Sequence, residues 1–202
     1  RLEADEQLWR LSVIDNGGGI HVVYDHDGSV LRNYYGADAR LLGIAMPEWG
    51  VGPVVTEGFV LLNGASVNQY KPTPEQFSGV VAHEVGHAIG LAHSQTNGAS
   101  AIYADHTGPD ACAIPYASRA PNVSVETMYP VIALSAVGTH MGSVDIRDDR
   151  VSLSNLYPAP GWPAAHASIS GRVTLPDGTT DLTGVNVVAR NLADPFNDAV
   201  SA

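Results

Sequence analysis

The stretch HEVGHAIGLAHS, residues 83–94, carries the information that decides the fold and the chemistry of this chain. His83 and His87 are four residues apart, so on a helix they share one face, separated by roughly 6 Å of rise. Both imidazoles can therefore bind one zinc ion, through zinc–nitrogen bonds of about 2.0–2.1 Å. Glu84 projects about 100° around the helix, which places its carboxylate beside a metal-bound water and not among the ligands.

His93 can reach the same metal only if the chain turns after the helix. A helix that continued past Ile89 would carry His93 away from the metal. Gly90 resolves this, because glycine readily adopts the left-handed conformation that ends a helix. His93 then becomes the third ligand, and the fourth position stays open for water, as in catalytic zinc sites. The alternatives are a surface helix that happens to carry histidines and a zinc site without activity. The first is disfavoured because such a combination arises by chance in about one chain of this composition in twenty thousand.

The sequence also predicts where this helix begins. Thr73 can cap it, Pro74 fits the first helical position, and Gln76 completes a capping box. Apolar residues then recur at helical spacing. They are Phe77, Val80, Val81, Val85, Ala88 and Ile89.

At these residues the chain resembles the metzincin metalloproteases, which carry H-E-x-x-H-x-x-G-x-x-H and a methionine turn beneath the metal. Met128 is the candidate for that methionine, and Ser94, after the third histidine, resembles the matrixin branch. Tyr129 directly follows Met128, and Pro130 stands where some relatives place a switchable tyrosine ligand. A tyrosine ligand is therefore not expected.

Further along, Asp148-Asp149 followed by Leu156-Tyr157 resembles the final helix of a matrixin catalytic domain, so the resemblance covers about residues 10–158. It implies an α+β fold with a twisted, mostly parallel sheet, an edge strand over the cleft, a zinc-binding helix and a C-terminal helix. It also implies a zinc-dependent endopeptidase that hydrolyses peptide bonds in extracellular proteins, with Glu84 as general base and acid. The alternative is a weak or inactive binding or adhesion module on the same fold.

Three strands are expected before the zinc helix, at residues 20–24, 40–46 and 59–63. The second would end at Pro47. If it forms the edge of the sheet, Gly43, Ile44 and Ala45 bind the extended substrate; a plain core strand is the alternative. Pro130 and the apolar residues 131–134 are expected to wall the pocket for the side chain after the cut, or else to belong to the core.

Other metal sites are weaker candidates. His21 and His26 lie in the right half of the chain for a second zinc site, but their spacing fits strand or turn histidines better. The turns at residues 15–19 and 25–28 offer hard oxygen ligands near glycines, which makes calcium a candidate alongside ordinary turns. Cys112 lies in a Gly-, Ala-, Ser- and Pro-rich stretch between residues 94 and 127 and is expected to be inert. The remaining histidines rank lower still: His106, His140 and His166.

The composition limits the partners, the scaffold and the location that are expected for this protein. The chain has 202 residues, 45% hydrophobic content and a net charge of −11 with only 10 basic residues, so nucleic acid is not an expected partner. A single cysteine excludes a disulfide-stapled scaffold, and no apolar run reaches the length of a membrane span. We expect a secreted or cell-surface bacterial protein that acts on a protein or peptide substrate.

After residue 158 the character of the chain changes. Residues 159–167 are rich in Pro, Gly and Ala and are expected to form a linker after the protease domain at residues 1–158. Residues 168–202 then alternate apolar and polar side chains around Asp177-Gly178, which predicts β-hairpins. They resemble the start of a carboxypeptidase-regulatory-like β-sandwich module, and about 35 residues are too few for a complete one. We expect a truncated module of a longer exoprotein.

Overall fold

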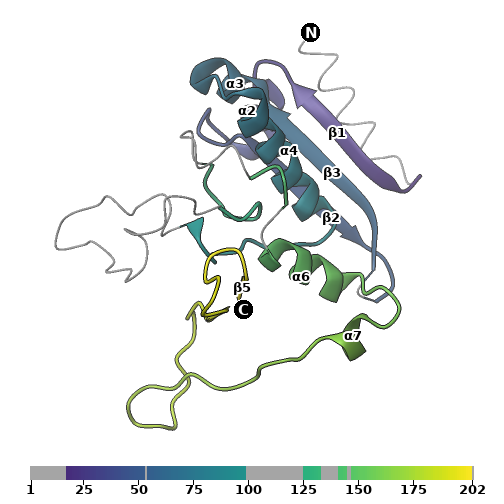
Figure 1. Ribbon diagram of the computed structural model, residues 1–202. Coiled ribbons are helices and arrows are strands. Elements are labelled where there is room, and N and C mark those ends of the chain that lie inside the picture. The colour runs from purple at the N-terminus through teal and green to yellow at the C-terminus, as the bar shows by residue number, and fades with distance from the viewer. Residues whose placement is uncertain (1–16, 53, 99–124, 133–140, 145–146, 202) are drawn as a thin grey trace, which may run out of the picture.

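The protein is described by a computed structural model at residues 17–52, 54–98, 125–132, 141–144 and 147–201 (Figure 1). Within these ranges it has a mixed α/β architecture, in agreement with the expected α+β class. The main sheet has three strands, β1 (Gly19–Asp25), β2 (Gly43–Trp49) and β3 (Val55–Asn63), in the order β1-β3-β2. β1 runs parallel to β3 and β2 runs antiparallel to it, so the sheet is mixed and not mostly parallel as expected.

Helices cover the sheet and continue the chain beyond it. They are α2 (Ser29–Tyr35), α3 (Gly64–Tyr70), α4 (Pro74–Ala88), α6 (Arg147–Leu156) and α7 (Trp162–Ala165). A separate antiparallel pair, β4 (Val188–Arg190) and β5 (Ala199–Ser201), lies near the C-terminal end. None of the helices in the described ranges is both long enough and apolar enough to cross a lipid bilayer.

The central strand β3 carries core residues on both faces. Phe59 and Leu61 cluster with buried residues of α2, whereas Val60 and Leu62 cluster with buried residues of α4. A strand that is covered on both sides shows a continuous apolar run instead of alternation, and this explains the sequence of β3. The first cluster packs α2 against one face of the sheet, and the second packs α4 against the other.

The C-terminal end of α4 touches the backbone of β3. A Cβ atom at Gly58 would lie 2.5 Å from the carbonyl oxygen of Ala88 and 2.9 Å from its Cβ atom. Glycine is therefore the residue that allows this approach. The contact holds the second half of α4, which carries the histidines, close to β2 and β3.

Both ends of α4 form as the sequence predicts. Thr73 Oγ1 accepts a hydrogen bond from the Gln76 amide at 3.3 Å, and Gln76 Oε1 accepts one from the Thr73 amide at 2.9 Å. At the other end Gly90 has a φ of +99°. A Cβ atom there would also lie 2.8 Å from the Trp49 ring, so glycine serves both the turn and the packing.

β1 and β3 are longer than predicted, whereas β2 has the predicted length but begins and ends three residues later and does not end at Pro47. Pro47 pairs with Gly58 in the middle of the β2–β3 ladder. Proline lacks an amide hydrogen, and it is tolerated here because β2 is an edge strand among the described residues. The short helices α2 and α3 were not predicted, since neither is long enough to show a helical period.

The segment after α7 is extended and largely exposed until it returns to α6. Figure 1 shows it leaving α7 and bringing β5 back beside α6. Of the β-hairpins predicted for residues 168–202, the described part of the chain has the short antiparallel pair β4–β5 and one isolated antiparallel bridge, Thr174 to Asp181. The predicted domain limits stay a prediction.

We expect Thr73→Ala to destabilise the fold by about 1 kcal/mol, because it removes the side-chain acceptor of the capping box. In a chain of this size that corresponds to a fall in Tm of about 2–4 °C. Thermal unfolding followed by circular dichroism measures the change. Ser78→Ala, an exposed position within α4, is the matched control and should leave Tm within error or raise it slightly. An equal loss in both variants would contradict a specific role of the cap.

Candidate metal centre and active site

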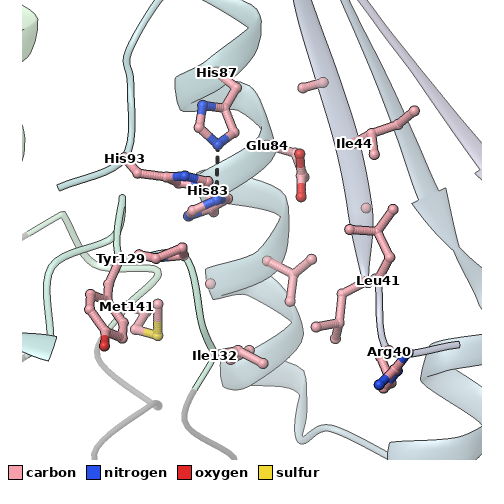
Figure 2. A pocket seen from close by; sticks show the side chains of 16 residues that line it. Arg40, Leu41, Ile44, His83, Glu84, His87, His93, Tyr129, Ile132 and Met141 are labelled. Atoms are coloured by element: carbon pink, nitrogen blue, oxygen red, sulfur yellow. Dashed lines mark hydrogen bonds between the residues drawn. The ribbon is translucent and has the colours of Figure 1, made fainter. Parts of the chain in front are cut away.

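Three imidazoles converge at the C-terminal end of α4. His83 and His87 extend from the helix, and His93 comes from the irregular segment after Gly90 (Figure 2). One ligand nitrogen of each lies within 4.8 Å of those of the other two. The Nε2 atoms of His83 and His87 are 3.1 Å apart. His83 and His87 are half-buried and His93 is exposed, so the cluster opens towards solvent at the third histidine.

Backbone carbonyl groups orient the imidazoles of His83 and His87 through hydrogen bonds to their Nδ1 atoms. Nδ1 of His83 lies 2.7 Å from the carbonyl oxygen of Thr127, and Nδ1 of His87 lies 2.8 Å from that of Leu91. A carbonyl can only accept, so each Nδ1 carries the proton. Each Nε2 is then left with its lone pair directed into the cluster, the tautomer that binds a metal.

The donor set fits zinc. Three ligands at about 2.0–2.1 Å in a tetrahedral site have nitrogens roughly 3.4 Å apart, close to the spacing between His83 and His87. The imidazoles must also be neutral to bind metal. Burial lowers the pKa of His83 to about 4, and it also lowers the pKa of His93. Neither of these rings needs to lose a proton to bind a metal at neutral pH.

Glu84 lies between the helix and the edge strand. Its side chain is 6% exposed, and burial raises the pKa of its carboxyl to about 7. A Cβ atom at Gly43 would lie 2.9 Å from Glu84 Oε1, so the glycine of β2 makes room for this carboxylate. Figure 2 shows Glu84 directed towards the strand that carries Ile44, and both Glu84 and His93 line the same pocket. The carboxyl is thus able to both take and give a proton near neutrality.

Met128 packs beneath the histidines, as predicted. A Cβ atom at Gly86 would lie only 2.3 Å from Met128 Sδ, so the methionine sits directly on the helix between His83 and His87. The Asp149 carboxylate accepts hydrogen bonds from the amides of Thr127 at 2.8 Å and Met128 at 3.2 Å. The turn that carries Met128 is therefore tied to α6.

A pocket of about 310 Å³ runs from the histidines along α4 and β2. Gly43, Ile44, Ala45 and Pro130 line it, which is where the sequence placed the substrate-binding residues. Its other lining residues are Arg40, Leu41, Leu42, Gly79, Val80, His83, Glu84, His87, His93, Tyr129, Ile132 and Met141. Of the predicted pocket wall, Val131 lines a smaller adjoining pocket, and residues 133 and 134 lie outside the described ranges.

The pocket has features that the sequence did not reveal. Asn63 donates to the Leu41 carbonyl at 2.7 Å, and Ser66 donates to the Ala39 and Leu41 carbonyls at 2.6 and 2.8 Å. These bonds hold the loop before β2 and so place Arg40 at the far end of the pocket (Figure 2). In the sequence, the position of this loop is indicated only weakly, by an Asn at the end of a strand and a Ser at the start of the next helix.

The structure separates the other candidate metal residues. His21 is 2.7 Å from Glu57 Oε1 and stacks on Phe59, while His26 meets Tyr24 edge to face. Among the described residues, the three histidines of the pocket are the only group of three or more potential ligands that converge.

The acidic turn at residues 25–28 serves α2. Asp25 accepts a hydrogen bond from the Leu31 amide at 2.9 Å, and Asp27 accepts one from the Ser29 amide at 3.0 Å. Calcium binding there stays a prediction. Four of the other weaker candidates lie outside the described residues: His106, His140, Cys112 and Asp15. His166 lies within them and stacks on Trp162, with ring centres 3.6 Å apart.

We expect Gly86→Ala to destabilise the protein by about 1–3 kcal/mol, because the new methyl group would collide with Met128 Sδ. Met128→Ala removes the colliding group and costs about 2–5 kcal/mol through the cavity that it leaves. The double variant should be more stable than the sum of the two changes predicts, a positive coupling measurable by urea denaturation. Strict additivity would show that the two side chains do not meet.

Between pH 6.5 and about 4, His83 should contribute a loss of stability to the chelator-treated protein as the pH falls. In this range the unfolded chain binds a proton at His83, whose pKa is 6.5 there, whereas the folded site with a pKa of about 4 does not. The raised pKa of Glu84 acts in the opposite direction, so the contribution of His83 is measured as a difference between variants. Towards low pH the Tm of His83→Gln should fall less, or rise more, than that of the wild type, and the exposed His166→Gln should match the wild type. An identical slope of Tm against pH in His83→Gln and the wild type would contradict the buried neutral imidazole.

Comparisons of the chain with family models, curated proteins and solved structures find no match. The interpretation of the site therefore depends on its own geometry and chemistry.

Proposed function

We propose that this protein is a zinc-dependent endopeptidase of the metzincin type, similar to the matrixins. One observation carries the proposal: three imidazole nitrogens converge within 4.8 Å at the wall of a pocket that also contains a buried carboxyl group. His83, His87 and His93 would hold the zinc ion. Three ligands of this kind leave a position for water, which is the arrangement of hydrolytic zinc sites.

Zinc at this site would supply a Lewis acid that polarises the scissile carbonyl and lowers the pKa of a bound water towards about 7. The protein's own contribution begins with Glu84. Its carboxylate takes a proton from the attacking water and afterwards gives it to the leaving amine. The pKa of about 7 describes the site without metal, and a nearby cation lowers it, which favours the base form at the first step.

The edge strand supports an extended substrate. β2 pairs with β3 on one side, and in the described part of the chain no strand pairs with its other side. A peptide lying along Gly43, Ile44 and Ala45 can form backbone hydrogen bonds there and pass between β2 and the histidines. This geometry favours cleavage within a chain, because an extended peptide can continue in both directions.

The walls of the pocket indicate an apolar side chain next to the cut. Leu42, Val80, Ile132 and Met141 are among the apolar residues that line the pocket beyond the histidines. Burying such a side chain provides binding energy in proportion to the apolar area removed from water. A secreted or cell-surface location, as expected from the composition, gives such an enzyme access to extracellular proteins.

Glu84→Gln should lose peptidase activity by a factor of about 10²–10⁴, because glutamine cannot transfer the proton. It should keep one bound zinc per chain, measured by elemental analysis after desalting, since Glu84 is not a ligand. Glu75→Gln, an exposed carboxylate on the same helix, is the matched control. Activity is measured on casein and on a peptide library, with and without a chelator.

Two outcomes would count against the proposal. Retained activity in Glu84→Gln would remove the assigned role of the carboxyl group. Absence of peptide cleavage by the zinc-loaded wild-type protein would favour the alternative of a binding or adhesion module on the same fold.

A further inference from the structure

We propose that the C-terminal segment at residues 186–201, called here the docked segment, positions the third metal ligand. Arg190 and Asp148 act as positioning residues for His93. The inference depends on the proposed function only in that the three histidines bind zinc. It concerns the part of the site that the helix does not fix.

His93 is the ligand with the least local support. His83 and His87 belong to α4, whose backbone bonds fix them relative to each other. His93 lies on irregular backbone beyond Gly90, and its side chain is exposed. Its position depends on the residues that follow it, from Ser94 to Asn97.

Each of these four residues contacts the docked segment. Ser94 Oγ lies 3.2 Å from Ser201 Oγ, and the Gln95 carbonyl accepts a hydrogen bond from Asn186 at 2.7 Å. Arg190 donates to the Thr96 carbonyl and, at 2.7 Å, to Asn97 Oδ1. Asn97 Nδ2 in turn donates to the Phe196 carbonyl at 2.7 Å. Thr96 and Asn97 are 3% and 1% exposed, so the bonds that they make to Arg190 and Phe196 are partly buried, whereas the Gln95–Asn186 bond is exposed.

Asp148 joins the docked segment to the same loop from α6. Its carboxylate is 1% exposed and accepts a hydrogen bond from the Ser94 hydroxyl. Its other oxygen accepts the Ser201 amide of β5. A buried carboxylate requires such donors, and one of them comes from the docked segment. Loss of that donor would leave Asp148 free to move, and Ser94, directly after His93, would move with it.

A second buried carboxylate completes the arrangement. Glu126 accepts the amides of Asn97 at 2.9 Å and Gly98 at 3.0 Å, so it holds the loop from the side of Met128. Burial lowers the pKa of the Arg190 guanidinium, and the charge of Glu126 acts against that lowering. The loop after His93 is thus fixed between a carboxylate of the main domain and a cation of the docked segment.

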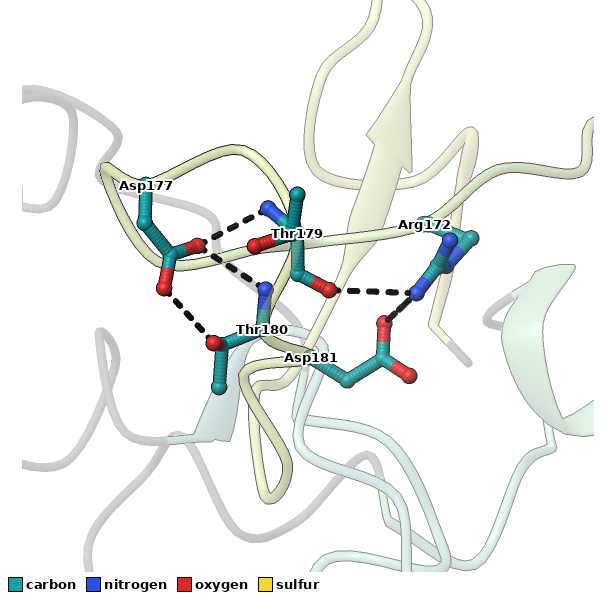
Figure 3. A network of polar contacts seen from close by, with 5 residues as sticks. All are labelled: Arg172, Asp177, Thr179, Thr180 and Asp181. Carbon is teal, nitrogen blue, oxygen red and sulfur yellow. Dashed lines mark hydrogen bonds and ion pairs between the residues drawn. The ribbon is translucent and has the colours of Figure 1, made fainter.

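Residues 172–181, which precede the docked segment, form a separate polar network that does not involve the loop after His93. Figure 3 shows a turn in which Asp177 accepts the amides of Thr179 and Thr180, both at 2.8 Å. Arg172 pairs with Asp181 at 2.7 Å, and both side chains are more than half exposed. This network closes on itself. Arg172 is therefore a matched control for Arg190. It is also an arginine of the C-terminal region and forms an ion pair, but it does not contact the loop after His93.

The test measures metal binding by the full chain and not its activity. Zinc affinity is determined by competition with a chromophoric chelator, and cobalt(II) is substituted to record its visible absorption, which depends on the ligands and their geometry. We expect Arg190→Ala to weaken zinc binding at least about tenfold and to change the cobalt spectrum, as loss of a group that orients a ligand does. Arg172→Ala should match the wild type in both measurements.

Ser201→Pro supplies a second variant, because it removes the amide and hydroxyl donors of Ser201 to Asp148 and the hydroxyl contact with Ser94. It should change the cobalt spectrum in the same direction and weaken zinc binding. If Arg190→Ala does not fold, as judged by circular dichroism, Ser201→Pro decides the question alone. Wild-type zinc affinity and spectrum in the folded variants would overturn the proposal, and so would an equal loss in Arg172→Ala. A wild-type protein that binds no zinc would instead overturn the proposed function.

Discussion

The site depends on the orientation of three imidazole rings. An imidazole on a helix can rotate about two bonds, so sequence spacing alone does not aim its ring nitrogen. Here the Thr127 carbonyl holds His83 and the Leu91 carbonyl holds His87. Each of these carbonyls lies in a segment with its own constraint. Leu91 follows the glycine turn, and the amide of Thr127 is bound to Asp149. The rest of the described structure can be understood as the support of these two carbonyl groups and of the chain that carries His93.

Buried carboxylates provide much of that support. Glu126, Asp148 and Asp149 are each at most 2% exposed, and each accepts backbone amides from segments near the histidines. Burial raises the pKa of Glu126 and of Asp149, which records the cost of removing these groups from water. That cost is offset by directional hydrogen bonds, which fix positions more precisely than apolar contacts do. A metal site needs this precision, because small displacements of a ligand weaken binding.

The sequence predicted what is local and missed what is distant. The capping box at Thr73, the helix with its two histidines and the turn at Gly90 all arise from residues within one or two turns of each other. The roles of Gly58 and Gly86 depend on a strand and a methionine brought together by folding, so no pattern in their neighbourhood revealed them. Asp148 and Asp149 were noticed as a pair by resemblance, but their partners Ser201 and Thr127 lie 53 and 22 residues away, respectively. The mixed sheet was missed because the direction of β2 is set by its pairing and not by its composition.

The separation in sequence between His93 and its support has a consequence for the order of assembly. α4 closes through bonds between near neighbours, a process that takes microseconds or less in isolated helices. The bonds from the docked segment to the loop after His93 join residues 91 to 107 positions apart. Contacts of such long range form late, since the chain must lose much of its freedom first. During synthesis, two histidines are in place long before residue 201 is made. The pocket would therefore acquire its complete set of three converging histidines only when the rest of the described structure is already folded around it.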